Sequence, residues 1–414
     1  MNNLFGVKTA IAVLIAATET TGSAMTITFT DLTPSVATSS EVRAASGLQQ
    51  GGIVTINGQM RAALWAGSAN SFANFDPGTY QTAINALSTS GQYGTVNWSG
   101  PRLHAAMWSG TPASCVDLNP PFAISSGITA ANAAQQGGVL TLVVDGPWHA
   151  ALWSGTATAC VDLHPSGSVA SYIEGMSDTQ QVGWVDWGTG PHAALWTGTP
   201  DSIVDLNPIG ATNSVANGAS ESQQFGTATF SGVMHAALWS GSAASFVDMH
   251  PVGADASSIS AANGSLLVGT VTMQGSSCAA LWLTNAPNAW INLGRVLGSG
   301  YSNSEGIAIT SVGNTTYISG NAVTAGGQQH AMLWIVTFLP QLSLIRTFQP
   351  SLAVQPAFSS LSLGTNYQLQ VSSDLITWKN SGAAFIATNT SMTFSQSWEV
   401  YNSQQLFFRL QTAP

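Results

Sequence analysis

The sequence has very few charged side chains. Only 6% of its 414 residues are Asp, Glu, Lys or Arg, and 18 acidic residues against 8 basic ones give a net charge of −10. No Lys or Arg lies between Leu103 and Gly294. A nucleic-acid partner requires clustered cations that displace counterions from phosphates, and an anionic membrane surface attracts the same clusters. We therefore expect no nucleic-acid partner and no electrostatic attachment to a membrane.

Cysteine is also scarce, and the three cysteines show no metal-type spacing. Cys115 and Cys160 each stand two residues before an aspartate, at a recurring position that elsewhere holds Ile203, Phe246 or Trp290. A position that accepts Cys, Ile, Phe and Trp is an apolar core site. We predict no disulfide, no zinc site and no other metal site.

Motifs of catalysis and membrane insertion are missing as well. No H-E-x-x-H, G-x-S-x-G, Walker loop or G-x-G-x-x-G occurs, so no cofactor is predicted. Only the N-terminus carries a long apolar run: Lys8 precedes Thr9 to Thr18, and small residues follow at 22–24. This pattern predicts a signal peptide over residues 1–24 and an extracellular or cell-surface location, with a disordered apolar leader as the alternative. Elsewhere no segment approaches the roughly 18 apolar residues that a membrane helix needs.

The chain contains an internal repeat. The pentad His-Ala-Ala-Leu-Trp, or a variant of it, ends at seven tryptophans spaced 43, 45, 43, 43, 43 and 52 residues apart, namely Trp65, Trp108, Trp153, Trp196, Trp239, Trp282 and Trp334. A glycine stands 13 to 15 residues before each tryptophan, and an Asp-Leu-x-Pro element follows most of them. A period near 43 with four short β-like runs is typical of β-propeller blades.

The copy from Ser168 to Pro208 shows the expected strands. We place them at Val169 to Ile173, Gln181 to Trp187, His192 to Trp196 and Ile203 to Leu206, with turns at Gly, Ser, Thr, Asn and Pro clusters. The last copy lacks an Asp-Leu-x-Pro strand after Trp334, whereas an unpartnered one begins at Asp31. We predict an all-β protein: a seven-bladed β-propeller over residues 25–340, closed by the N-terminal strand, which forms the outer strand of the last blade.

The repeated polar residues are predicted to be structural. A hairpin after Trp108 places Asp117 opposite Ala106 and diagonal to His104, so a His–Asp contact is expected to lie buried once per blade. Catalytic groups are rarely repeated around a ring, whereas packing devices are. One copy has Arg61 in place of the histidine, and another has Cys278 together with Asn292.

This pattern of His-Ala, an apolar residue, Leu-Trp, a Gly turn and Asp-Leu resembles the HAF-type extracellular repeats of bacteria, over about residues 26–338. It differs in having Ala or Met at the usual third aromatic, and Asn-Pro or His-Pro instead of a glycine run. The resemblance implies export and a propeller-like repeat. It assigns no activity to particular residues.

Residues 341–414 form a separate segment. Alternating apolar residues, at Tyr367 to Val371 and at Leu406 to Leu410, predict a small antiparallel β-sandwich. The stretch from Ser372 to Trp378 is similar to the Asp-box turn of sialidase blades, but it is one residue short and lacks the glycine. We predict a structural turn there.

Candidate binding residues are those that the repeat does not explain. Loops between second and third strands, and turns between blades, open on one face of a propeller around its channel. This face is predicted to hold Trp98, Arg102, Asp145, Trp148, Asp186 and Trp187 from the loops, and His164 and His250 from the turns. Aromatic plates beside carboxylates and amides suit sugar rings. The alternative is that the tryptophans only cover blade ends and the aspartates only end strands.

We expect an exported, non-enzymatic protein whose loop-rich face binds a neutral glycan or a surface protein. One alternative is a carbohydrate hydrolase or lyase that uses Asp145 and Asp186 or a histidine. A glycosidase needs two carboxylates in one cleft, and Glu174, Glu221 and Glu305 stand at non-equivalent positions without an evident partner. The second alternative is a structural repeat protein of a surface layer or matrix.

Overall fold

The computed structural model describes residues 25–98, 100, 102–347, 353–399 and 406–413, so the predicted signal peptide lies outside the described residues. The chain divides into two compact units. The larger contains Thr28–Thr310 and Tyr317–Trp334, and the smaller contains Ser311–Thr316 and Ile335–Pro414 together with Met1–Ile27. Both are built from strands, with only short 3-10 helices among the described residues, so the predicted all-β class is confirmed.

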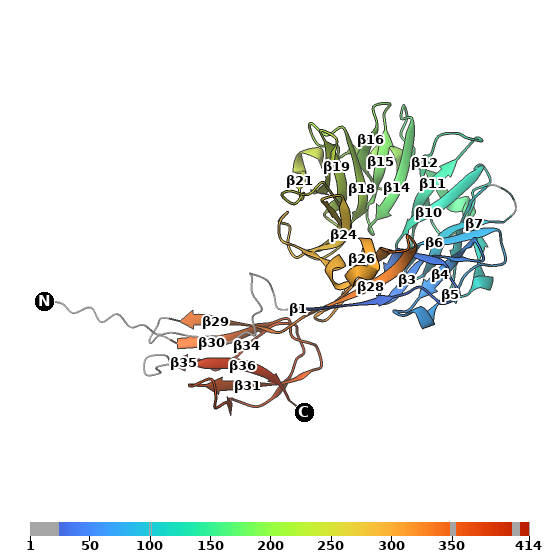
Figure 1. The fold of residues 1–414 in the computed structure, drawn as a ribbon. Coiled ribbons are helices and arrows are strands. Elements are labelled where there is room, and N and C mark those ends of the chain that lie inside the picture. Colours follow the sequence, from blue (N-terminus) through green and yellow to red (C-terminus); the bar gives the residue numbers. More distant parts are fainter. Residues whose placement is uncertain (1–24, 99, 101, 348–352, 400–405, 414) are drawn as a thin grey trace. The chain divides into compact units, whose positions relative to one another are not determined.

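Four-stranded antiparallel sheets follow one another along the chain (Figure 1). The first three are β2 (Ser39–Ser46), β3 (Gln49–Ile56), β4 (Gln59–Trp65) and β5 (Ala73–Asn74); β6 (Gln81–Ser88), β7 (Gly91–Asn97), β8 (His104–Trp108) and β9 (Val116–Asp117); and β10 (Ser125–Ala131), β11 (Gln136–Thr141), β12 (His149–Trp153) and β13 (Cys160–Asp162). The next three are β14 (Ala170–Met176), β15 (Gln181–Asp186), β16 (Pro191–Trp196) and β17 (Val204–Asp205); β18 (Asn213–Ala219), β19 (Gln224–Phe230), β20 (Val233–Trp239) and β21 (Val247–Asp248); and β22 (Ala256–Asn263), β23 (Leu266–Met273), β24 (Ser276–Trp282) and β25 (Trp290–Asn292).

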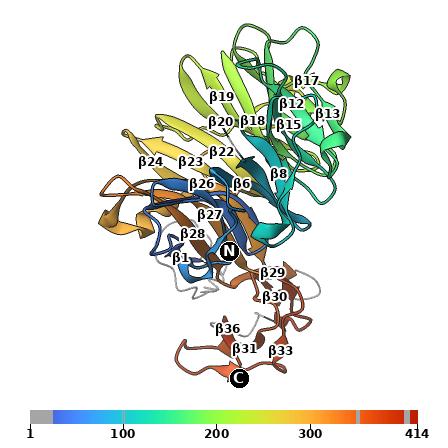
Figure 2. The same ribbon diagram turned by 90° about the vertical axis from the view of Figure 1, so that its right-hand side faces the viewer.

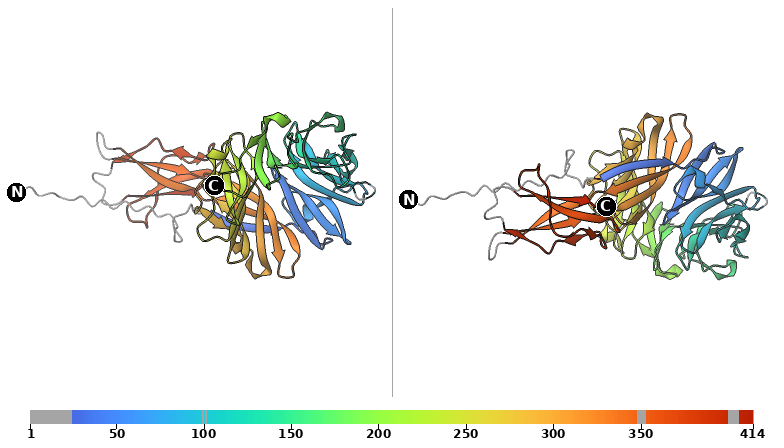
Figure 3. Two further views of the ribbon diagram at one scale, coloured as in Figure 1. Left: turned by 90° about the horizontal axis from the view of Figure 1, so that it is seen from above. Right: turned by 90° about the horizontal axis from the view of Figure 1, so that it is seen from below.

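A seventh sheet joins the two ends of the repeat region. It has the order β1-β28-β27-β26, with β1 (Met25–Asp31), β26 (Tyr301–Val312), β27 (Thr315–Thr324) and β28 (Gln329–Phe338). The Leu32 amide donates a hydrogen bond to the Ala331 carbonyl at 2.8 Å, which continues the pairing of β1 with the strand that contains Trp334. Figure 3 shows the sheets from above and below, coloured along the chain from blue to orange.

Short 3-10 helices occupy most turns between third and fourth strands. They are η1 (Ala69–Ser71), η2 (Pro112–Ser114), η3 (Ala157–Ala159), η4 (Pro200–Ser202) and η5 (Ala243–Ser245), with η6 (Leu293–Val296) and η7 (Gly298–Gly300) after the sixth sheet. No helix among the described residues is long and apolar enough to cross a membrane.

The strands predicted between Ser168 and Pro208 correspond to β14 to β17, and the clearest difference is that β14 runs on to Met176. The seven pentad tryptophans are the largest fully buried side chains, which confirms their structural role. The repeated glycine has a steric reason. A Cβ on Gly183 would lie 1.9 Å from the Tyr172 carbonyl oxygen, so only glycine lets the first two strands approach this closely.

A repeated hydrogen bond joins each sheet to the next. The second residue of each pentad donates its amide to a hydroxyl oxygen near the start of the following sheet at 2.8–3.0 Å, in the pairs Ala62–Thr82, Ala105–Ser126, Ala150–Ser171, Ala193–Ser214, Ala236–Ser257, Ala279–Ser304 and Ala331–Ser40. The last pair joins the seventh sheet to the first. The Val42 amide adds a second link between these two sheets, to Asn321 Oδ1 at 2.8 Å.

The predicted His–Asp contacts are confirmed, but their predicted burial is wrong. Asp117 pairs with Ala106 across β8 and β9, as expected. The five pairs are His104–Asp117, His149–Asp162, His192–Asp205, His235–Asp248 and His330–Asp31, with Nδ1 to Oδ2 distances of 2.7–2.9 Å. The histidine side chains are 14–29% exposed and the aspartates 32–47%, because each pair lies at the ends of its strands, beside a turn.

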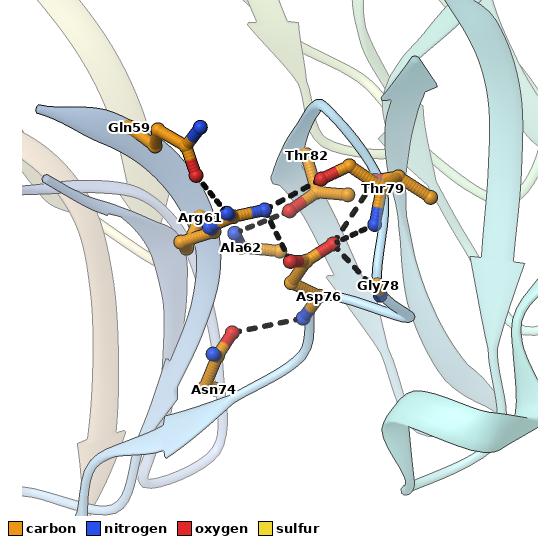
Figure 4. A network of polar contacts seen from close by, with 8 residues as sticks. All are labelled: Gln59, Arg61, Ala62, Asn74, Asp76, Gly78, Thr79 and Thr82. Atoms are coloured by element: carbon orange, nitrogen blue, oxygen red, sulfur yellow. Dashed lines mark hydrogen bonds and ion pairs between the residues drawn. The ribbon is translucent and has the colours of Figure 1, made fainter. Parts of the chain in front are cut away.

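The first sheet replaces this pair with a different network (Figure 4). Asn74 occupies the aspartate position, opposite Ala63, and Arg61 instead forms an ion pair with Asp76 two residues further on. Arg61 also donates to the Thr79 carbonyl at 2.6 Å, and Asp76 Oδ1 accepts the Thr79 amide at 2.9 Å. The longer arginine thus reaches a carboxylate at a shifted position.

The smaller unit contains two further antiparallel sheets (Figures 1 and 2). One comprises β29 (Gln341–Thr347), β30 (Ala353–Ser359), β34 (Met392–Thr393) and β35 (Trp398–Glu399), and the other β31 (Asn366–Ser372), β32 (Lys379–Asn380), β33 (Phe385–Ile386) and β36 (Phe407–Thr412). Phe358 and Phe394 from the first sheet region share one core with Tyr367 and Phe408 from the second. Asp374 caps the predicted turn by accepting the Ile376 and Thr377 amides at 2.8 and 2.7 Å.

Candidate functional site

A cavity of about 330 Å³ opens between the first strands of four consecutive sheets. Its lining includes Arg43 from β2, Asn85 from β6, Thr129 from β10 and Tyr172 from β14, together with Trp148 from the loop before β12. We call it the channel cavity. Residues that lie about 43 positions apart in the sequence therefore meet at one site.

β-Bulges direct polar side chains toward this space. The first strand of each of the first six sheets shifts register by one residue, at Arg43 in the first sheet and Glu174 in the fourth. A bulge re-aims the extra side chain. Arg43 Nη1 donates to Asn85 Oδ1 at 3.0 Å, Asn85 Nδ2 donates to the Ile128 carbonyl at 3.1 Å, and Thr129 Oγ1 donates to the Ile173 carbonyl. These side chains form a polar row that runs from sheet to sheet.

Three aromatic rings stand beside this polar row. Tyr172 and Trp184 are paired across β14 and β15, and their rings lie parallel, 7° apart, with centroids at 5.9 Å. Trp148 packs edge-on against both, at 5.8 Å from Tyr172 and 6.2 Å from Trp184. Trp148 is 52% exposed, so one face of this aromatic cluster is open to a ligand.

Burial and pairing act on the ionisable groups near the cluster. Burial raises the pKa of Glu174, and the hydrogen bond from Trp184 Nε1 at 3.2 Å offsets only part of this effect. Burial and the nearby Glu174 carboxyl also raise the pKa of Tyr172. Arg43 forms an ion pair with Glu41 at 2.9 Å. The cavity therefore offers aromatic surface and hydrogen-bonding groups, and the arginine in its lining is paired with an acid.

Of the predicted tryptophans, only Trp148 belongs to the aromatic cluster. Trp98 and Trp187 are exposed and make no ring contact with another described aromatic residue. Arg102 is exposed, on a loop whose residues 99 and 101 are outside the described part of the chain. These three side chains do not line the channel cavity.

The predicted aspartates have different environments. Asp186 Oδ1 accepts the amides of Gly188 and Gly190 at 2.7 and 3.1 Å, so it shapes the loop that carries Trp187. Asp145 is exposed and adopts a left-handed conformation with φ of 55°. Among the described residues, no group of three or more His, Cys, Asp or Glu side chains is arranged to hold a metal ion.

The two predicted histidines are held within the turns between sheets. His164 Nδ1 lies 2.8 Å from Ser171 Oγ, Nε2 lies 3.1 Å from Ser168 Oγ, and the ring stacks on His149 at 3.9 Å. His250 is held similarly, with Nδ1 at 2.8 Å from Ser257 Oγ and the ring 4.0 Å from His235, but its Nε2 lies 3.1 Å from the Ala254 carbonyl. Other copies use an asparagine here, such as Asn119, whose Oδ1 accepts the Ser126 hydroxyl at 2.7 Å. The turn therefore accounts for both histidines, and neither lines the channel cavity.

Sequence reasoning missed the strand residues of the site, chiefly Arg43, Asn85, Tyr172, Glu174 and Trp184. Tyr172 and Trp184 could have been found by comparing the repeat copies with one another at equivalent strand positions. Where the fourth sheet has Tyr172, the second, third and fifth have Ala83, Gly127 and Val215; where it has Trp184, they have Thr95, Val139 and Thr227. Only the fourth sheet places two aromatics at this pair of positions.

Comparison with known proteins gives no family for this chain: no family model matches it, and no curated protein matches it. Among solved structures, similar folds include TolB from Acinetobacter baumannii, with 9% identity, a TM-score of 0.37, and coverage of 69% of this chain and 63% of that one. The β-propeller domain of the trilobed protease from Pyrococcus furiosus has 8% identity and a TM-score of 0.47, covering 72% of this chain and 94% of that domain. The lectin SapL1, solved with alpha methyl fucoside, has 12% identity and a TM-score of 0.23, covering 87% and 98%.

Proposed function

We propose that this is an exported, non-enzymatic binding protein whose larger unit is a closed seven-bladed β-propeller, and that it binds a neutral glycan in the channel cavity. The observation that carries the proposal is the aromatic cluster of Trp148, Tyr172 and Trp184, with its open face beside a row of hydrogen-bonding side chains.

The closed ring is inferred from the bonds between sheets. The amide-to-hydroxyl hydrogen bond recurs seven times, and its last member, from Ala331 to Ser40, leads back to the first sheet. The pairing of β1 with β28 supports the same reading. Export is inferred from the predicted signal peptide over residues 1–24 and from the resemblance to the HAF-type repeats.

The chemistry of the cavity favours a neutral sugar over a charged ligand. A pyranose ring stacks its apolar C–H face on an aromatic plate and directs its hydroxyls to polar groups at the rim. Trp148 offers such a plate, and the polar row offers Arg43, Asn85 and Thr129 as donors and acceptors. Because Arg43 is paired with Glu41, it offers hydrogen bonds without an unbalanced positive charge.

A glycan array followed by calorimetry with the best ligand tests the proposal. Trp148→Ala is expected to weaken binding by about tenfold or more, because it removes a stacking contact of roughly 1.5 kcal/mol. Trp187→Ala is the matched control, since this exposed tryptophan belongs to a corresponding loop but lacks a ring partner. Equal affinities of Trp148→Ala and the unaltered protein would refute the aromatic site. An unaltered protein that binds no glycan would favour a protein partner or a structural role in a surface layer or matrix.

One observation favours a carbohydrate hydrolase or lyase as the second candidate. Glu174 lies beside the aromatic cluster with a raised pKa, as a general acid requires. If the protein is an enzyme, Glu174→Gln abolishes release of reducing sugar and retains binding. If it only binds, the unaltered protein releases no sugar from the glycan identified on the array.

A further inference from the structure

The sixth sheet contains a second cavity, of about 250 Å³, at the place where most other sheets hold the His–Asp pair. Cys278 stands in the histidine position, and Asn292, paired with Ala280, stands in the aspartate position. Gly294 takes the place of the asparagine or histidine that follows two residues later in most copies. All three line the cavity, together with Arg295 and Ser304. We call it the sixth-sheet cavity.

Two polar groups in this cavity lack their usual partners. Asn292 Oδ1 is buried and accepts no hydrogen bond from any described residue, whereas its counterpart Asp117 accepts from His104 at 2.8 Å. Ser304 Oγ accepts the Ala279 amide at 3.0 Å, but its hydroxyl has no acceptor in the described part of the chain. Its counterpart Ser126 donates to Asn119 Oδ1. An unpaired buried acceptor costs roughly 1–3 kcal/mol, so a ligand that pairs with it is favoured. Other buried side-chain atoms among the described residues also lack a partner, chiefly Nε1 atoms of pentad tryptophans, but Asn292 is the residue among them that lines this cavity.

The charge at this cavity is positive and unbalanced. Arg295, on η6, is exposed and forms no ion pair or hydrogen bond with a described residue. No acidic side chain lines the cavity, because asparagine has replaced the aspartate. Cys278 adds no negative charge, since burial raises the pKa of its thiol to about 11. An arginine without an acidic partner beside a cavity is suited to binding a carboxylate.

We propose that the sixth-sheet cavity binds a small carboxylate that also carries hydroxyl groups, such as a sugar acid. The carboxylate would accept hydrogen bonds from the Arg295 guanidinium and the Ser304 hydroxyl. A hydroxyl of the same molecule would donate to Asn292 Oδ1. This site is separate from the channel cavity and shares no lining residue with it, so it does not depend on the neutral-glycan proposal.

Calorimetry on the full chain, with glucuronate as the probe and glucose as its neutral counterpart, tests the proposal. We expect glucuronate to bind and glucose to bind at least tenfold more weakly. Arg295→Met, a change at an exposed position, should weaken glucuronate binding at least tenfold while the melting temperature stays unchanged. Trp148→Ala should leave glucuronate binding unaltered, which separates this site from the channel cavity.

A rebuilt sheet provides the second test. The double variant Cys278→His, Asn292→Asp restores the pair seen in five other sheets, fills the cavity and adds a negative charge, so glucuronate binding should be lost. The proposal is overturned if glucuronate does not bind the unaltered protein, if glucose binds equally well, or if Arg295→Met binds as tightly as the unaltered protein. Retained binding by a folded double variant would overturn it as well.

Discussion

Replacing Leu32 with alanine tests whether the N-terminal strand is an integral part of the seventh sheet. Leu32 follows β1, and its amide donates to the Ala331 carbonyl at 2.8 Å. Leu118 is its counterpart after β9, where the chain is continuous within one sheet, and its amide donates to the Ala105 carbonyl at the same distance. Both leucine side chains are fully buried. The two positions thus share their backbone bond and their burial, but differ in how the strand is connected to its sheet.

The expected magnitude follows from this equivalence. Truncation of a buried leucine to alanine removes the transfer free energy of its methyl groups and leaves a cavity, at a total cost of about 2–5 kcal/mol. If β1 is held as firmly as β9, Leu32→Ala and Leu118→Ala should each lower the free energy of unfolding by about 3 kcal/mol. If β1 detaches easily, truncation of Leu32 should cost under about 1 kcal/mol, because the strand would already be partly free.

Urea unfolding followed by tryptophan fluorescence provides the measurement, because the seven pentad tryptophans are fully buried. Ser40→Ala and Ser126→Ala extend the comparison, since each removes the hydroxyl that accepts a pentad amide. Each should cost roughly 1–3 kcal/mol, because a buried amide is left unpaired. The reasoning fails if the changes at Leu118 and Ser126 destabilise the protein and those at Leu32 and Ser40 do not.

Three further predictions concern single positions. Burial and the neighbouring His149 lower the pKa of His164 below 6.5. The contribution of neutral His164 to stability is therefore complete above pH 6.5 and is lost as the pH falls toward the pKa of the folded state. In urea titrations, His164→Asn should be as stable as the unaltered protein at pH 7.5 and should lose less stability than it at pH 5. Gly183→Ala should cost about 3 kcal/mol or more in the same assay, because the new Cβ meets a backbone carbonyl at 1.9 Å. Burial raises the pKa of the Cys160 thiol to about 12, so iodoacetamide at pH 8 should label it only after unfolding, as mass spectrometry would show.

The repeat made most of the strands predictable, because the pentad and its glycine fix the register of three strands in each sheet. The hairpin geometry also gave the right neighbour for Asp117, and the surplus Asp-Leu-x-Pro element pointed to the pairing of β1 with β28. The partial exposure of the His–Asp pairs was not predictable from alternation alone. Alternation predicts which side chains lie on the same face of a strand. It does not predict how exposed to solvent the end of that strand is.

The bulges explain why most of the site was missed. A register shift of one residue reverses the face on which every following side chain lies. The local sequence around Glu174 contains no pattern that predicts the shift found there. Trp148 was predictable because it lies in a loop that the repeat does not explain. Its partners Tyr172 and Trp184 lie within strands, where they resemble ordinary core residues until the copies are compared position by position.

In such a repeat, a substitution that only varies the structure is accompanied by a second residue that restores the lost bond, whereas a substitution at a binding site is not. Where Arg61 replaces histidine, Asp76 restores an ion pair, and where His164 replaces asparagine, its ring nitrogens take over the bonds of the amide. Departures of this kind replace the lost bond with another. The sixth sheet departs without compensation, because Asn292 Oδ1 stays unpaired beside a cavity and Arg295 lacks an acid. The sixth sheet therefore combines an unpaired acceptor and an unpaired cation at one cavity, and the sugar-acid proposal rests on this combination.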